Sequence, residues 1–238
     1  MGGRVTGVRA VGAEAFRNGA GPPAPTGRVS IGMLGGTFDP IHLGHLALAR
    51  AARSNVGLDE IVFVPAARPP HKLGRPISPA NDRLAMVELA VEGEPATSVS
   101  RIELDRSGPS YTVDTVAAML DEAAREDREI DVTVILSAES FADLPDWHAA
   151  DRLVELATIA VAPRPGHPLP VPTTLADKLP GLIGRLIVIN DTLPDISASA
   201  IRARVAAGRP IDHLVPPRVA AYIEEHHLYR DPSTRKDS

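Results

Sequence analysis

The chain alternates short apolar runs with stretches in which apolar residues recur at helical spacing. The apolar runs typical of buried strands are Val29–Leu34, Ile61–Pro65, Thr97–Ile102, Val132–Leu136, Thr158–Ala162 and Arg185–Asn190. Helical spacing spans Leu43–Ser54, Asn81–Val91 and Thr112–Arg125, and a further helix ends over Leu153–Leu156. Strands that alternate with helices predict βαβ units. The expected fold is therefore α/β, a doubly wound, Rossmann-like, mostly parallel sheet with C-terminal helices.

The two ends of the chain and two Pro-rich segments depart from this alternation. The segment Ala198–Tyr229 is predicted to be helical, with breaks near residues 208–210 and 215–217, and residues 66–78 and 163–180 are predicted loops. Residues 1–28 show no apolar segment of a secretory signal, so we expect a disordered leader, with a misassigned start or a transit peptide as alternatives. Residues 29–229 then form a single domain, and residues 230–238 a tail.

Composition narrows the class of protein mainly by exclusion. The 238 residues carry 25 Lys and Arg against 30 Asp and Glu, a formal net charge of −5, which disfavours a nucleic-acid partner. The absence of cysteine excludes disulfides, thiolate metal sites and a Cys nucleophile. No apolar run has the length of a membrane span. We expect a cytoplasmic protein without a membrane or nucleic-acid partner, in which a homo-oligomer is possible. The core must be aliphatic, since only 3% of residues are aromatic.

The first candidate site lies where the first strand gives way to the first helix, in Gly35-Gly36-Thr37-Phe38-Asp39-Pro40-Ile41-His42-Leu43-Gly44-His45. The glycines permit a tight turn and a close approach to a ligand, and a helix start favours phosphate. His42 and His45, three residues apart, are expected to project to one side. A simple turn, an incomplete metal site and buried structural histidines remain alternatives for the single features.

A second candidate anion site follows the last strand, in Ile196-Ser197-Ala198-Ser199-Ala200-Ile201-Arg202. Ser197 or Ser199 is a natural N-cap of the next helix, and Arg202 can offer a forked cation to phosphate oxygens. Alone, a capped helix with an exposed Arg explains this segment better.

Together the two segments resemble the nucleotidyltransferase superfamily. The first matches its signature G-x-F-x-P-x-H-x-G-H, and the second is similar to its I-S-x-[ST]-x-[IV]-R element, which binds the β- and γ-phosphates of ATP. The segment around Gly36 has neither the Lys of a GxxxxGK[ST] loop nor the GxGxxG fingerprint.

The middle of the chain resembles the bacterial nicotinate mononucleotide adenylyltransferases in particular. The segment Arg68–Lys72 looks like their P-H-K segment, and Gly108–Thr115 like their S-Y-T-x-D-T segment, at which a helix start receives the nicotinate carboxylate. The segment Leu136–His148 is similar to L-G-x-D-x-[LF]…L-x-x-W, with Ser137 and Glu139 in place of the family's Gly and Asp. The loop Ala162–Gly166, with Arg164, looks like an R-P-G loop near the adenine site.

The resemblance implies transfer of AMP from ATP to nicotinate mononucleotide, with deamido-NAD and pyrophosphate as products and Mg²⁺ bound through ATP rather than in a protein cage. Four residues are the implied catalytic set: His42, His45, Lys72 and Arg202. The implied ATP and phosphate contacts are Gly35, Gly36, Thr37, Phe38, Gly44, Ile196, Ser197, Ser199 and Arg164. The implied mononucleotide contacts are Lys72, Tyr111, Thr112, Glu139 and Trp147, the last by stacking on the pyridine ring.

Three other functions stay open from the sequence. Nicotinamide mononucleotide could replace the acid as the substrate. A pantetheine-phosphate adenylyltransferase typically has Thr at the position of His42 and a shorter chain. A non-catalytic nucleotide-binding module is disfavoured because His42, His45, Lys72 and Arg202 are all present.

Overall fold

A computed structural model describes residues 17–18, 27–68, 77–163, 169, 175 and 177–230. The strands are β1 (Arg17–Asn18), β2 (Val29–Gly36), β3 (Glu60–Pro65), β4 (Thr97–Val99), β5 (Ile130–Ser137), β6 (Thr158–Ala162) and β7 (Leu186–Val188). The helices are α1 (Leu43–Val56), α2 (Ala80–Val91), α3 (Thr112–Arg125), α4 (Ala138–Ala142), α5 (Ala150–Leu156), α7 (Ala198–Ala206) and α8 (Pro217–Glu225). Short 3₁₀ turns lie at η3 (Leu144–Asp146) and η4 (Ile183–Arg185).

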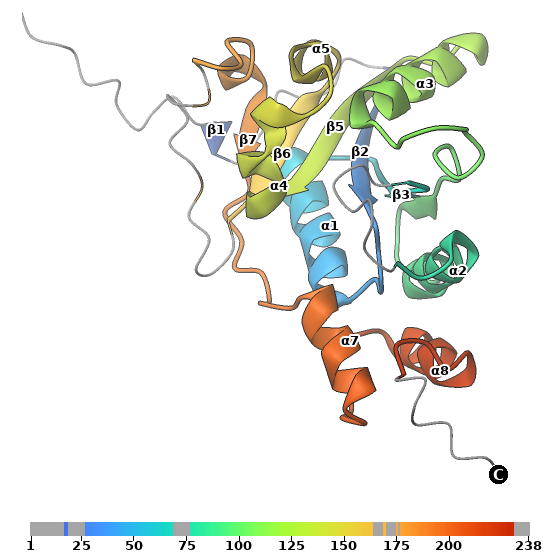
Figure 1. The fold of residues 1–238 in the computed structure, drawn as a ribbon. Helices are drawn as coiled ribbons and strands as arrows, with labels where there is room; N and C mark the ends of the chain where they lie inside the picture. The colour runs from blue at the N-terminus through green and yellow to red at the C-terminus, as the bar shows by residue number, and fades with distance from the viewer. Residues whose placement is uncertain are drawn as a thin grey trace, which may run out of the picture.

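The strands form one sheet in the order β1-β7-β6-β5-β2-β3-β4, and every pairing is parallel (Figure 1). The predicted Rossmann-like fold is confirmed. The central strand β2 pairs with β3 on one side and with β5 on the other. The chain order therefore reverses between β2 and β5, and in such sheets ligands bind beyond the carboxyl ends of the strands at this switch point.

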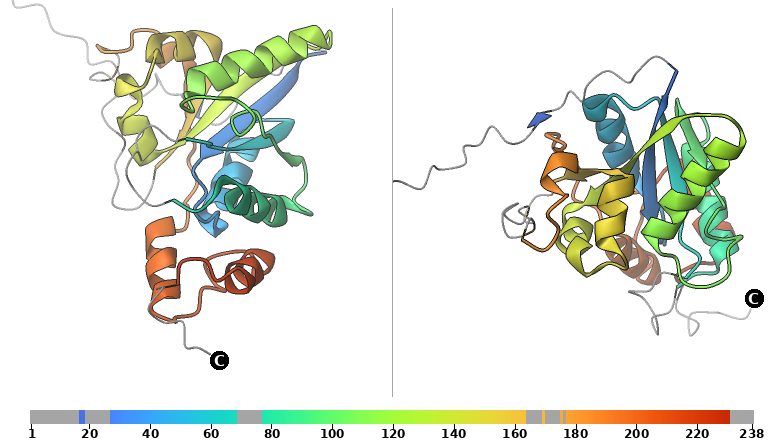
Figure 2. Two further views of the ribbon diagram at one scale, coloured as in Figure 1. Left: turned by 45° about the vertical axis from the view of Figure 1, so that its right-hand side comes forward. Right: turned by 90° about the horizontal axis from the view of Figure 1, so that it is seen from above.

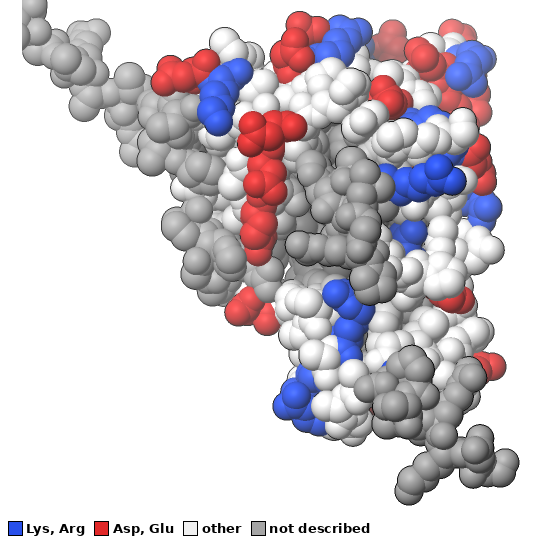
Figure 3. All heavy atoms as spheres, viewed as in Figure 1, with Lys and Arg blue, Asp and Glu red and all other residues white. Residues whose placement is uncertain are grey.

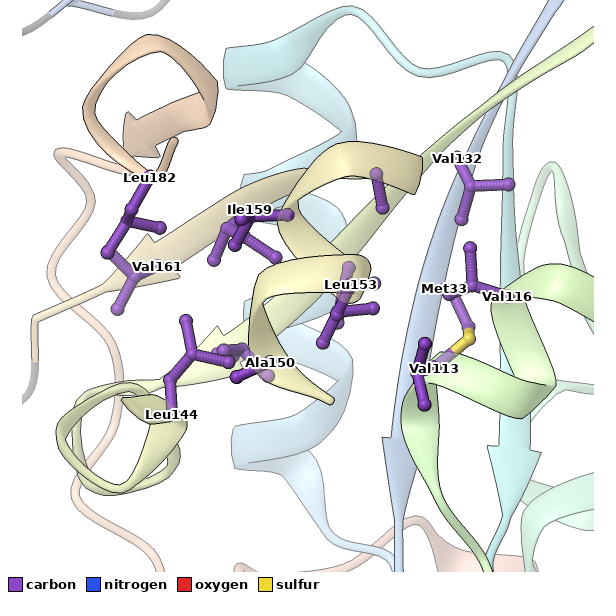
Figure 4. Packing of buried hydrophobic residues seen from close by; sticks show 14 of the residues in the cluster. Met33, Val113, Val116, Val132, Leu144, Ala150, Leu153, Ile159, Val161 and Leu182 are labelled. Atoms are coloured by element: carbon purple, nitrogen blue, oxygen red, sulfur yellow. The ribbon is translucent and has the colours of Figure 1, made fainter. Parts of the chain in front are cut away.

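Two aliphatic cores lie on the two faces of the sheet. One joins α3, α4 and α5 to the sheet, and Figure 4 shows Met33 of β2, Val113 and Val116 of α3, and Leu153 of α5 converging there. The other joins α1, α2, α7 and α8 to the opposite face. Parallel strands need this cover on both sides, which explains why they read as continuous apolar runs.

The C-terminal helices α7 and α8 lie at the end of the molecule toward which the strands point (Figures 1 and 2). The predicted breaks near residues 208 and 216 separate α7 from α8, as expected. This placement brings the second candidate motif to the same end of the sheet as the first.

Several boundaries differ from the sequence expectation, most of them by one or two residues. Strand β4 ends at Val99 rather than at Ile102, and β7 ends at Val188 rather than at Asn190. Within the predicted leader, Arg17 and Asn18 pair with Ile187 and Val188 of β7 as the edge strand β1. No helix in the part of the chain that the structure describes is long and apolar enough to cross a membrane.

Candidate functional site

The two candidate motifs meet at the carboxyl end of β2. The guanidinium Nη1 of Arg202 on α7 donates to the backbone carbonyl of Asp39 at 2.7 Å. A Cβ on Gly44 would lie 3.6 Å from the Cβ of Ile196, so the start of α1 is packed against the residue that precedes the α7 cap. Figure 3 shows basic side chains in the region of α7, whose basic residues are Arg202 and Arg204. This end of the sheet therefore has basic character where phosphate is expected to bind.

The two histidines lie face to face at the start of α1. His42 is the N-cap of the helix and His45 is three residues further on, with the ring centroids 3.7 Å apart and an interplanar angle of 22°. The backbone N–H of His42 donates to Nδ1 of His45 at 3.2 Å. Because Nδ1 accepts this bond, the neutral His45 ring carries its proton on Nε2. The projection of both rings to one side is as expected, although His42 precedes the first helical turn.

The start of α1 has fewer available N–H groups than a bare helix end. The N–H of His42 is bonded to His45, and the N–H of Leu43 donates to the carbonyl of Leu214 at 2.9 Å. Gly44 packs tightly against His42, because a Cβ there would lie 3.0 Å from Nδ1 of that ring, which would have to shift to admit it. Gly35 is different: a Cβ there would meet only the Cε of Met33 at 3.5 Å, so the protein itself leaves room for a side chain.

Phe38 supports the histidines from inside the core. Its side chain is only 2% exposed, and its ring packs edge-on against His45 with centroids 5.0 Å apart. The Phe38 ring is thus in position to support His45, and its predicted contact with ATP stays a prediction. Phe141, which the sequence places in the substrate segment, is likewise buried, at 1% exposure.

The cap of α7 confirms one of the two serine alternatives. Ser197 is the N-cap, and its hydroxyl accepts from the N–H of Ala200 at 3.3 Å. Ser199 is exposed, with its hydroxyl 3.3 Å from that of Ser197. The two hydroxyls and Arg202 thus border the site from the α7 side.

The segment before α3 is hydrogen-bonded to the residues that follow β3. Tyr111 is the N-cap of α3, and Thr112 is its first residue. The hydroxyl of Ser110 accepts from the N–H groups of Ala67 at 3.0 Å and Arg68 at 3.2 Å. Arg68, the first residue of one predicted substrate segment, therefore lies beside Ser110 of another that is far away in the sequence.

Trp147 and Glu139 follow β5. Trp147 is partly buried against the core beside α3, α4 and α5, and Glu139 is partly exposed in the first turn of α4. His148, for which surface placement is the default expectation, is exposed and also stacks on Tyr111 with ring centroids 4.2 Å apart. That contact joins the start of α3 to the segment that contains Trp147.

Two predicted site residues, Lys72 and Arg164, lie outside the described residues. The roles predicted for the other site residues are not tested by these contacts and stay predictions.

Sequence reasoning missed a buried polar group beneath the site. Arg83 of α2 is 2% exposed and donates from Nη1 to the carbonyls of Thr37 and Ala66, each at 2.8 Å, and from Nε to the carbonyl of Ser78 at 3.0 Å. Burial lowers the pKa of Arg83, and the Asp39 carboxylate opposes that shift. Its position was detectable, because an Arg at 83 aligns with the buried Met86, Val87 and Ala90 on one helix face.

A second missed group is the pair of Asp39 and Tyr229. Asp39 is 5% exposed, and its Oδ1 accepts from the Tyr229 hydroxyl at 2.7 Å. Burial and the neighbouring Asp39 carboxylate raise the pKa of Tyr229 well above its usual range. No local pattern in the sequence indicates this contact.

Known proteins resemble this chain in both sequence and fold. Residues 33–204 match the cytidylyltransferase-like family. A probable nicotinate-nucleotide adenylyltransferase of Dehalococcoides mccartyi is 45% identical over 198 residues, 83% of this chain and 96% of the relative. One of Roseiflexus is 46% identical over 200 residues, 84% of this chain and 98% of the relative. These relatives confirm the predicted nucleotidyltransferase class and the role in NAD biosynthesis.

The fold comparison agrees with the sequence comparison. The structure of the Plasmodium falciparum nicotinic acid mononucleotide adenylyltransferase complexed with NaAD has a TM-score of 0.66 and 18% identity, over 85% of this chain and 98% of that one. At this identity the likeness establishes the fold. On the matched family and the relatives together, the chain belongs to the cytidylyltransferase-like family, among its nicotinate-nucleotide adenylyltransferases.

Proposed function

We propose that this chain transfers the AMP moiety of ATP to nicotinate mononucleotide, giving deamido-NAD and pyrophosphate. The observation that carries the proposal is the meeting of the two motifs, in which Arg202 donates to the carbonyl of Asp39 three residues before the paired histidines begin. Two imidazoles and a guanidinium thereby border one point at the switch point of the sheet. The relatives named for this reaction support the choice of substrates.

The chemistry needs positioning more than proton transfer. A phosphate oxygen of the mononucleotide, already anionic at neutral pH, attacks the α-phosphorus of ATP in line, and pyrophosphate leaves. No general base and no covalent enzyme intermediate is required. The side chains hold the two phosphates in line and stabilise the charge that develops on them.

The proposal assigns each phosphate group a partner according to the motif in which that residue lies. Nε2 of His45 donates to the α-phosphate, and His42 contacts the neighbouring phosphates. Arg202 holds the β- and γ-phosphates together with Ser197 and Ser199, and Lys72 holds the substrate phosphate. The backbone of residues 35–38 passes close to the nucleotide, which explains a glycine at position 35 where the protein itself leaves space.

The pyridine end of the substrate is assigned to the segments that follow β5 and precede α3. The hydroxyl of Thr112 and the N–H groups at the start of α3 receive the nicotinate carboxylate, because a helix start favours an anion. Trp147 stacks on the pyridine ring. The contact between Tyr111 and His148 holds these two segments together.

The metal partner of this proposal is Mg²⁺ that arrives with ATP. The side chains that border the phosphate site are imidazole, guanidinium and hydroxyl groups, whereas Mg²⁺ prefers carboxylate, phosphate and water oxygens. Among the residues that the structure describes, no group of three or more His, Asp and Glu could hold a metal ion. Mg²⁺ would neutralise charge on the phosphate oxygens. A cytoplasmic location and a possible homo-oligomer belong to the same proposal.

The test is pyrophosphate release from ATP with either mononucleotide. We expect release with nicotinate mononucleotide and much slower release with nicotinamide mononucleotide. Faster release with the amide would transfer the assignment to that substrate, and no release with either would leave a nucleotide-binding module. Replacement His45→Ala removes one donor to the α-phosphate and should lower kcat about 10²-fold or more in a chain that circular dichroism shows to be folded.

A further inference from the structure

The loop of residues 38–42 ends at His42 and leads into the helix that contains His45. The C-terminal part of the chain holds this loop in place. The carboxylate of Asp39 accepts from the hydroxyl of Tyr229, 190 residues away, at 2.7 Å, and from the N–H of Ser78 at 3.4 Å. Asp39 lies between Phe38, whose ring supports His45, and the His42 cap. A displacement of Asp39 would therefore move both histidines.

Tyr229 reaches Asp39 by an unusual path of the backbone. Helix α8 ends at Glu225, and the chain then turns through His227 at φ 52° and Tyr229 itself at φ 63°. Residues other than glycine adopt this left-handed conformation rarely, and it persists only where the surrounding contacts favour it. The contacts in this case are those of the Tyr229 side chain, which packs against the core that joins α1, α2 and α8 and has its hydroxyl 4.0 Å from Sδ of Met86.

The same residues are held at two further points by the C-terminal part of the chain. Arg202 of α7 donates to the carbonyl of Asp39, and the carbonyl of Leu214 accepts from the N–H of Leu43. Leu214 lies between α7 and α8. These three hydrogen bonds join residues 39–43 to residues 202–229, and that of Tyr229 is made to a charged, buried side chain.

We propose that Tyr229 is a positioning residue for the adenylyl transfer: its hydrogen bond to Asp39 holds the loop of residues 38–42 so that His42, His45 and Arg202 face the phosphates together. The inference rests on the proposed function, because it concerns the geometry of that site. Tyr229 touches no reacting atom. It acts through Asp39, and its loss should lower kcat more than it raises either KM.

The chain offers a matched control seven residues earlier, in helix α8. Tyr222 of α8 also donates its hydroxyl to an aspartate, Asp82, at 3.0 Å, but Asp82 lies in the first turn of α2 and not in the loop of residues 38–42. Replacement of either tyrosine by Phe removes one Tyr–Asp hydrogen bond and keeps the ring. Only Tyr229→Phe removes a bond to the buried Asp39, so it should lower the unfolding midpoint more than Tyr222→Phe does, and only Tyr229→Phe alters the site.

The experiment measures kcat, both KM values and the thermal unfolding midpoint for the wild-type chain, Tyr229→Phe and Tyr222→Phe, at a temperature where circular dichroism shows all three folded. We expect Tyr229→Phe to lower kcat about tenfold and Tyr222→Phe to leave it within twofold of wild type. Equal kcat values for all three, or a lower unfolding midpoint of Tyr229→Phe with wild-type kcat, would overturn the positioning role. A wild-type chain that releases no pyrophosphate would instead overturn the proposed function.

Discussion

The buried guanidinium of Arg83 makes the strongest stability prediction. It binds three backbone carbonyls that belong to three different segments: Thr37 after β2, Ala66 after β3, and Ser78 before α2. Arg83→Met keeps a side chain of similar reach and removes every one of these donors. The bond to Ala66 is buried and the other two are partly buried. Each carbonyl left without its partner costs about 1 kcal/mol, at the lower end of the usual range, so the free energy of unfolding should fall by about 3 kcal/mol.

The measurement is equilibrium unfolding in urea together with a thermal scan. A loss of about 3 kcal/mol corresponds to a midpoint lowered by about 6–12 °C in a chain of this size. Arg50→Met is the matched control, because Arg50 pairs with Glu94 and its side chain is 60% exposed. An exposed pair contributes about 0–1 kcal/mol, and the same substitution there should hardly change the midpoint.

The outcome that would refute the reasoning is a similar loss for both variants. A change below about 1 kcal/mol for Arg83→Met would mean that water or a rearranged backbone satisfies the three carbonyls. An Arg83→Met variant that loses activity but keeps its stability would also contradict the prediction, because these hydrogen bonds are expected to stabilise the fold and to affect the site only through it.

Two further predictions concern the two helix starts at the site. Gly44→Ala places a Cβ 3.0 Å from the His42 ring and 3.6 Å from Ile196, so we expect kcat to fall with only a small change in the unfolding midpoint. A wild-type kcat in this variant would show that the His42 ring can shift without cost. Ser197→Ala removes the cap of α7 and should lower the free energy of unfolding by about 1 kcal/mol, measured by urea unfolding, whereas Ser199→Ala should not.

The order of strands and helices was predictable from the sequence because the underlying patterns are local. Strand β6 and helix α3 agree with their predicted bounds, and the remaining strands of the domain occur where apolar runs predict them. Helix α4 was missed, since its five residues are too few to show helical periodicity. Strand β4 ends early because the chain turns after Val99, where the N–H of Asp105 bonds the carbonyl of Arg101.

The site was predictable to the extent that its chemistry lies in contiguous motifs. The histidine pair, the Ser197 cap and the start of α3 are each specified by neighbours within a few residues. The contacts between these motifs are not specified by neighbouring residues in the sequence. The bond from Tyr229 to Asp39 joins residues 190 positions apart, and that from Arg202 to Asp39 joins residues 163 apart. Neither has a periodicity or a spacing from which it could be inferred.

The exposure of the few aromatic side chains decides which of them a ligand could contact. From the sequence, rings near the motifs are all candidates for nucleotide contact. The structure divides them: Phe38 and Phe141 are buried, whereas Tyr111 and Trp147 are partly exposed at the carboxyl end of the sheet. A ring inside the core cannot stack on a ligand unless the core opens, but it can hold the group that does, as Phe38 holds His45. A motif therefore contains both residues that contact the substrate and residues that position them, and only the exposed fraction of each side chain separates the two.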